Sequence, residues 1–241
     1  MSGVLDLNRV REAYHLAKSR LMAALSAEGC WRGELSPSAL AVATAVAALT
    51  LVGKGAHAAL VQRGLRWLAA HQNADGGWGD TPDSPSNLST SWLCRAAFAI
   101  AAAEEAHAEA VRGVEAYLDR AAGSDTVQRV AAVRAVYGSD KTFASPILMM
   151  CALGGLVPWR AVPPLPFELS LTPRPLLGLA RLGVVSYALP ALIAIGQLIE
   201  SRRPSPNPIA RLVRRAALSP SLRLLTRIQP PSGGFLEAVP L

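Results

Sequence analysis

The sequence predicts an all-α protein built as an array of repeated helix pairs, and three observations support this fold class. Half of the residues are hydrophobic, and alanine and leucine dominate among them. This bias favours packed helices over sheets. A glycine–tryptophan turn, residues 72–80, separates two apolar runs, the first with clear helical spacing. A similar turn occurs earlier in the chain, so the unit of helix, turn and helix repeats.

The first predicted helix, Leu7–Leu25, is amphipathic and ends before a turn that contains Trp31. The next helix begins at residues 36–38, Ser-Pro-Ser, which supply a hydroxyl cap and a first-turn proline, and it continues to about Val52. Residues 35–53 carry no charge and are long enough to span a bilayer. Their hydroxyls, proline and alanines favour a buried core helix instead. A third helix is predicted from about residue 56 to residue 72.

Within the turn, the sequence from Gln72 to Asp80 favours a fastener between two helices. Glycine adopts the left-handed conformations that end a helix, so Gly76 and Gly77 stop the incoming one. The Gln72 amide can bond exposed backbone groups while the indole of Trp78 covers it. We therefore interpret Gln72, Asp75, Gly76, Gly77 and Trp78 as structural residues.

The pattern of this turn occurs three times. Trp31 recurs as Trp78, and the sequence of residues 36–40 recurs in similar form as residues 84–88, 48 positions on (84 − 36). A degenerate third copy lies at residues 229–237, where Gln229 comes first and Phe235 takes the tryptophan position. A two-helix repeat of this length indicates a helical array, in which each unit buries its apolar face only against its neighbours.

The rest of the chain continues the helical series. Helices are predicted over residues 88–103, 106–121, 125–137 and 142–156, the last with Met149 and Met150 as core filling. Residues 157–168 contain four prolines and should form an extended crossing loop. A helix over 183–199, a proline-rich linker over 203–208 and a basic helix over 209–228 follow.

Charge and cysteine content limit the partners and the compartment. The net charge is +7, and seven arginines cluster late in the chain: Arg202, Arg203, Arg211, Arg214, Arg215, Arg223 and Arg227. The simplest interpretation is a solvated helix face. Among binding roles, an anionic lipid surface fits this apolar chain better than nucleic acid, because no aromatic residue interleaves with the arginines. Three widely spaced cysteines indicate a reducing, cytoplasmic compartment, and early charged residues exclude a signal peptide.

The ordered motifs resemble one family. Residues 72–80 resemble the QW motif, Q-x-x-D-G-x-W, of squalene–hopene and oxidosqualene cyclases. Residues 143–168, with Pro158-Trp159 and a proline-rich loop, resemble the corresponding region of bacterial squalene–hopene cyclases. Residues 185–187, Val-Ser-Tyr, fit the helix start that follows there. The likeness covers most of the chain and only the N-terminal portion of the family.

The resemblance implies an α/α-barrel, or toroid, which this chain would hold in incomplete form. It divides the chain into an N-terminal helix and first turn (1–34), a squalene-cyclase-like barrel (35–203), and a linker, basic helix and degenerate turn (204–241). Family members are isomerases that fold squalene into polycyclic, hopanoid-type triterpenoids without a cofactor. They enclose an apolar isoprenoid between two barrels and bind one face of a membrane, here the cytoplasmic face.

No catalytic residue can be carried over from the family. Its alkene-protonating D-x-D-D motif lies in the second barrel and is absent from this sequence. The acidic cluster most similar to that motif lies in and just after a solvated turn and consists of Asp75, Asp80 and Asp83. Such a turn cannot supply a strong sequestered acid. The four histidines lack metal-ligand spacing, so no metal is expected. Trp159 is the candidate for lining an isoprenoid cavity; the alternative is that it anchors its own loop.

Two hypotheses follow. The first is an N-terminal cyclase barrel that contributes to triterpenoid formation, inactive alone, with its second barrel supplied in trans or lost. The second is a non-catalytic module that binds isoprenoids or another protein through the same barrel. Neither involves nucleic acid.

Overall fold

The computed structural model describes residues 6–31, 36–53, 55–138, 141–172, 189–231 and 235, and its regular elements are all helices. Among these residues the only β-type pairing is an isolated bridge between Leu25 and Trp31. The chain divides into two compact units, residues 1–36 and 37–241. The all-α prediction is confirmed, and the helices are those expected of an α/α-barrel domain. None of the described helices is both long and apolar enough to cross a membrane.

The first unit consists of one helix and one turn. Asp6 caps the N-terminus of helix α1 (Leu7–Ala23): its carboxylate accepts a hydrogen bond from the Asn8 backbone N–H at 2.9 Å. It ends two residues before the predicted boundary, because Leu25 already belongs to the turn. The helix has no buried residue within this unit, and its large apolar side chains are exposed: Leu7, Val10, Tyr14, Leu16, Leu21 and Met22.

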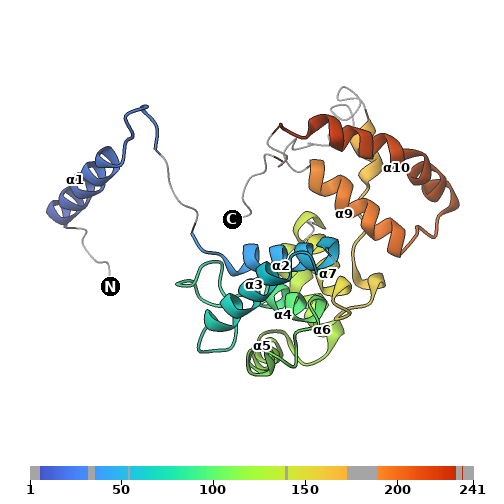
Figure 1. Ribbon diagram of the computed structural model, residues 1–241, viewed down its shortest axis with the longest axis horizontal. Helices are drawn as coiled ribbons and strands as arrows, with labels where there is room; N and C mark the ends of the chain where they lie inside the picture. The colour runs from blue at the N-terminus through green and yellow to red at the C-terminus, as the bar shows by residue number, and fades with distance from the viewer. Residues whose placement is uncertain are drawn as a thin grey trace. The chain divides into compact units, whose positions relative to one another are not determined.

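The second unit begins with six helices (Figure 1). They are α2 (Ala39–Gly53), α3 (Ala58–Ala70), α4 (Leu88–Ile100), α5 (Ala108–Ala122), α6 (Thr126–Tyr137) and α7 (Lys141–Leu153). Two of them start at the residues that the sequence indicated. Ser38 Oγ accepts from the Ala41 N–H at 3.3 Å, and Asn87 Oδ1 accepts from the Thr90 N–H at 2.8 Å.

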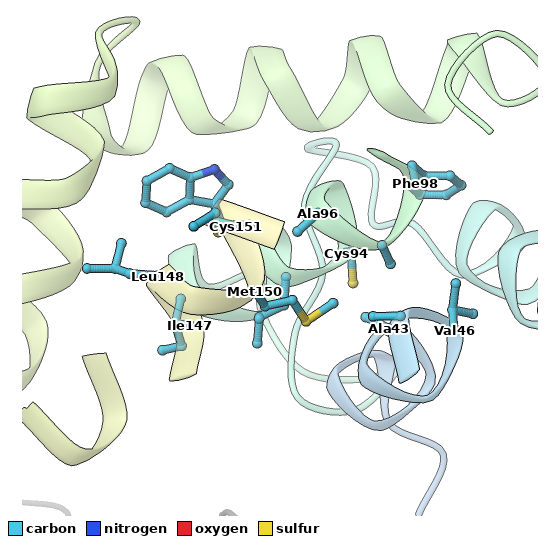
Figure 2. Close-up of a cluster of buried hydrophobic side chains, with 14 of the residues drawn as sticks. Ala43, Val46, Cys94, Ala96, Phe98, Ile147, Leu148, Met150 and Cys151 are labelled. Atoms are coloured by element: carbon cyan, nitrogen blue, oxygen red, sulfur yellow. The ribbon is translucent and has the colours of Figure 1, made fainter. Parts of the chain in front are cut away.

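Helix α4 forms the centre of this unit. All ten residues from Ser89 to Phe98 are buried, and the helix packs against α2, α5 and α7. Because it is covered on every side, it shows no polar face in its sequence. Figure 2 shows the core where side chains of three helices meet. They are Ala43 and Val46 from α2, Cys94, Ala96 and Phe98 from α4, and Ile147, Leu148, Met150 and Cys151 from α7. The prediction that the methionines fill the core is confirmed.

The proline-rich segment is not extended throughout, which corrects the sequence expectation. It contains two short 3₁₀ turns, η1 (Trp159–Ala161) and η2 (Phe167–Leu171). Proline cannot donate a backbone hydrogen bond, but its carbonyl can accept one. In the first turn the Ala161 N–H donates to the Pro158 carbonyl at 2.8 Å.

Two further helices complete the described chain. Helix α9 (Leu189–Arg202) and helix α10 (Pro208–Ile228) pack against each other and against η2 (Figure 1). Asn207 caps α10, and Pro208 occupies its first turn. The predicted helix over 183–199 is thus described from Leu189 onward, and its first six positions lie outside the described residues.

Candidate functional site

The turn after α3 is closed by hydrogen bonds within itself and to the segment that enters α4. The Asn73 N–H donates to the Gly77 carbonyl at 2.9 Å, and the Gly76 N–H donates to the Asn73 carbonyl at 2.8 Å. The Asn73 side-chain amide donates to the Ser84 carbonyl at 3.1 Å and to Ser86 Oγ at 3.0 Å. Sequence reasoning did not single out Asn73 or Ser86, since no pattern pairs residues eleven or thirteen positions apart.

Trp78 joins the end of α3 to the start of α4. Its side chain is 1% exposed, and its indole N–H donates to the Leu68 carbonyl near the end of α3 at 2.9 Å. Its backbone N–H donates to Ser91 Oγ in the first turn of α4 at 2.9 Å. The polar edge of the indole is therefore satisfied while its apolar surface is buried.

Gln72 extends the contacts of the turn to a third helix, α5. Its Nε2 donates to the Gly76 carbonyl at 2.7 Å and to the Ala110 carbonyl in α5 at 2.9 Å. Glycines lie on both sides of this contact, and the backbone requires one at position 76. Gly76 has φ +85°, and a Cβ there would clash with the Gly113 carbonyl, while a Cβ on Gly113 would meet the Gln72 amide at 2.9 Å. The residues expected to fasten two helices thus contact three.

Asp75 is held as a charged hydrogen-bond acceptor. Burial disfavours its charge, but hydrogen bonds from Ser86 Oγ (2.6 Å) and the Gly77 N–H (3.0 Å), together with the charge of Arg120, lower the pKa of Asp75 from its ordinary value. With a lowered pKa, Asp75 is ionised at neutral pH and carries no proton to donate. Protonation of an alkene requires a carboxylic acid that still carries its proton in a site shielded from water.

The first turn repeats the geometry of the second at an offset of 47 positions (78 − 31). The Trp31 indole N–H donates to the Leu21 carbonyl, as that of Trp78 does to Leu68. The Ser26 N–H donates to the Cys30 carbonyl at 3.0 Å, and the Gly29 N–H donates to the Ser26 carbonyl at 3.0 Å. These two bonds match the backbone bonds within residues 73–77. Gly29 has φ +75°, close to the +85° of its counterpart. Three hydrogen bonds and one unusual backbone conformation therefore recur in register.

The two copies differ in what surrounds them. Trp31 is 51% exposed, whereas Trp78 is 1% exposed. Leu25 stands where the second copy has Gln72, so the first turn has no side-chain amide to bond a third helix. A Cβ built on Gly29 meets nothing within 4 Å.

The third copy is described only at its edges. Gln229 is the C-terminal cap of α10, and Phe235 is 38% exposed. Residues 232–234 between them lie outside the described residues, so the third turn stays a prediction.

Trp159, the candidate for lining a cavity, lies in η1. Its side chain is partly buried and packs against the core of the second unit. A shallow hollow at the start of α6 is lined by its neighbours Pro158 and Arg160 but not by Trp159. This placement supports the alternative that Trp159 anchors its loop, while a role toward an isoprenoid stays a prediction.

Two networks of ion pairs, each formed around arginine side chains that are little exposed, were not anticipated from the sequence. Arg95, 9% exposed in α4, pairs with Glu104 and Glu115 at 2.6 Å each, and Glu115 also pairs with Arg129 at 2.8 Å. These contacts link α4, α5 and α6, so their role is structural. The position of Arg95 within an apolar run does not indicate which carboxylates pair with it.

The second network links the last helices. Arg214 of α10 pairs with Glu168 at 3.1 Å and Glu200 at 2.7 Å, joining η2, α9 and α10. Burial alone would lower the pKa of Arg214, but the hydrogen bonds that its guanidinium donates to these two carboxylates, together with their charges, outweigh burial and raise the pKa. Within the described part of the chain, no group of three or more potential ligand side chains could hold a metal.

Together the fold and the turns define an all-α repeat protein in which glycine–tryptophan turns follow helices α1 and α3. Residues 15–188 match the squalene-hopene cyclase N-terminal domain family, and the chain belongs to this family. A relative, enfumafungin synthase efuA of Hormonema carpetanum, is 34% identical over 108 residues. This match covers 45% of the chain but only 7% of the relative, which is a fungal protein. No solved structure matches the chain.

Proposed function

We propose that the chain acts as the N-terminal barrel of a cyclase that forms polycyclic, hopanoid-type triterpenoids. The observation that carries the proposal is the family match over residues 15–188, which includes the glycine–tryptophan turn. In this role the chain supplies part of the wall around an apolar, squalene-like isoprenoid and binds no cofactor. The barrel is inactive alone, because its sequence contains no D-x-D-D acid and Asp75, which lies in the glycine–tryptophan turn, has a lowered pKa and is ionised at neutral pH.

A second barrel completes the cyclase in this proposal and supplies the acid for isomerisation of squalene. Within the first unit, the turn has the same hydrogen bonds as the turn of the second unit, its tryptophan is half exposed and α1 has no buried residue. An amphipathic helix in this state gains by burial of its apolar face against another helix.

A non-catalytic binding module is the second candidate, and the structure contains one feature that favours it. Trp159 packs on the core and does not line the hollow beside it. On this hypothesis the barrel binds an isoprenoid or a protein and no cyclisation follows.

Binding of squalene tests the isoprenoid role that both candidates include. The purified chain should retain radiolabelled squalene from mild detergent in a saturable way, and unlabelled hexadecane should compete poorly, because a shaped wall distinguishes a branched polyene from a straight alkane. Equal competition by the two hydrocarbons, or no retention, would contradict an isoprenoid role. The reading frame downstream in the genome gives an independent check: further QW turns and an acidic motif there support a second barrel.

A further inference from the structure

A second hollow, of about 410 Å³, lies between the 3₁₀ turn η2 and helix α10. It is separate from the hollow beside Trp159, with which it shares no lining residue. Its wall is mostly apolar, and among the described residues that line it only Glu168 is charged. The other lining residues are Leu171, Thr172, Val213, Ala216 and Ala217. The hollow therefore offers a ligand hydrocarbon contacts and one carboxylate.

Glu168 is the part of the ion-pair network around Arg214 that borders this hollow. Arg214 Nε donates to Glu168 Oε1 at 3.1 Å, and Arg214 Nη1 donates to Glu200 Oε2 at 2.7 Å. The other oxygen of Glu200 accepts from the Ser205 backbone N–H at 3.0 Å. Glu168 Oε2 is buried and has no hydrogen-bond partner within the described part of the chain. Three of the four carboxylate oxygens thus have a donor, and the fourth needs one.

The same network has more negative than positive charge. It contains two carboxylates and one guanidinium, and each of the three side chains is at most 18% exposed. A charge with so little access to water costs free energy unless a counter-charge lies beside it. A cation that carries N–H groups would supply both the missing donor and the missing charge. A neutral alcohol would supply only the donor, and an anion would be repelled.

We propose that this hollow binds an organic cation, an alkylammonium group that donates to Glu168 Oε2 while its hydrocarbon part lies against Leu171 and Val213. Rotation about the last side-chain bond of a glutamate is soft, so a small turn of the carboxylate presents Oε2 to the ligand. A metal ion fits less well, because Ca²⁺ takes six to eight oxygen ligands and most of this wall is hydrocarbon. Binding needs neither squalene nor a second barrel, so its test is independent of the cyclase role.

Titration of the full chain with hexylammonium chloride tests the proposal, with isotope-labelled leucine and valine methyl groups observed by NMR. The Leu171 and Val213 signals should shift saturably, with a dissociation constant on the order of 1 mM for a ligand of this size. Hexanol should bind at least about tenfold more weakly because it lacks the charge, and hexanoate should leave these signals unchanged. Butylammonium should bind more weakly by about fourfold for each methylene that the hollow buries.

Two substitutions and a matched control test the site itself. Glu168→Gln keeps the shape of the side chain but removes its charge, so it should weaken hexylammonium binding at least about tenfold. Ala216→Phe fills the hollow from an exposed position and should abolish binding. Ala131→Phe, at an exposed position of α6, should leave binding unchanged, and all three variants should keep the circular dichroism of the wild type.

Three results would overturn the proposal. The first is equal binding of hexanol and hexylammonium, which would show that the carboxylate does not select a cation. The second is hexylammonium binding that persists in Ala216→Phe, which would place the ligand elsewhere. The third is displacement of hexylammonium by an equal concentration of sodium ions, which would identify a site for inorganic cations.

Discussion

The matched tryptophans of the two turns allow one test of how these turns stabilise the fold. Trp78 and Trp31 make the same indole hydrogen bond to a carbonyl ten residues earlier, but the first is 1% exposed and the second 51%. Removing a buried tryptophan costs about 3–5 kcal/mol. Trp78→Ala should therefore lower the free energy of unfolding by about 4 kcal/mol, a large part of the 5–15 kcal/mol typical of a domain. Trp31→Ala should leave the main unfolding transition within about 0.5 kcal/mol.

Urea titration followed by far-ultraviolet circular dichroism measures both variants, since that signal does not depend on the substituted fluorophore. Trp78→Phe separates the two contributions of the indole. It keeps most of the buried ring but removes the indole N–H, while the Leu68 carbonyl still accepts from the His71 N–H at 3.2 Å, so loss of this one hydrogen bond should cost about 0.5–1.5 kcal/mol. Equal destabilisation of the main transition by Trp31→Ala and Trp78→Ala would contradict this role of the buried indole, as would a cost below about 1 kcal/mol for Trp78→Ala.

Three other predictions concern the same unit. Gly76→Ala should lower the free energy of unfolding in urea titration by at least about 2 kcal/mol, because it adds a clash with Gly113 to the strain of a positive φ. Gly29→Ala introduces the strain alone and should lower the local stability of its turn by about 1–2 kcal/mol. Arg214→Met should lower the free energy of unfolding by about 3–5 kcal/mol, because it leaves Glu168 and Glu200 buried without a cation. Arg215→Met, at an exposed neighbouring position, should change it very little. Equal effects of the two substitutions would contradict the role of the buried ion pairs. The lowered pKa of Asp75 stabilises the fold above its unfolded value of 3.8, and this contribution is lost as pH falls through the lower folded pKa. The stability difference between wild type and Asp75→Asn should thus be constant near neutral pH and shrink below about pH 4; a difference that grows in acid would reverse the sign of the assignment.

Local chemistry made most helix boundaries predictable. Ser38, Asn87 and Asn207 cap their helices through their own side chains, and such signals depend on only two or three neighbouring positions. The turn was predictable for a similar reason, since its glycines and tryptophan are adjacent in sequence. The repeat strengthened this prediction, and the shared backbone geometry of residues 26–31 and 73–78 agrees with it.

Contacts between distant residues were not predictable from one sequence. The bond from Gln72 to Ala110 joins residues 38 positions apart, and no local pattern reports which helix lies opposite the amide. The same is true of Arg95, whose carboxylate partner Glu115 lies on the next helix. The 3₁₀ turns of the proline-rich loop were missed because the proline count excludes an α-helix but does not exclude a proline carbonyl as an acceptor.

We propose that this chain is a cyclase barrel that holds an isoprenoid without performing the reaction itself. The purified chain can be incubated with squalene, and the extracted lipids analysed by gas chromatography and mass spectrometry. We expect unreacted squalene and no hopene or other cyclic product, because the sequence contains no D-x-D-D motif and Asp75, with its lowered pKa, is ionised at neutral pH. Hopene formed by the chain alone would contradict it.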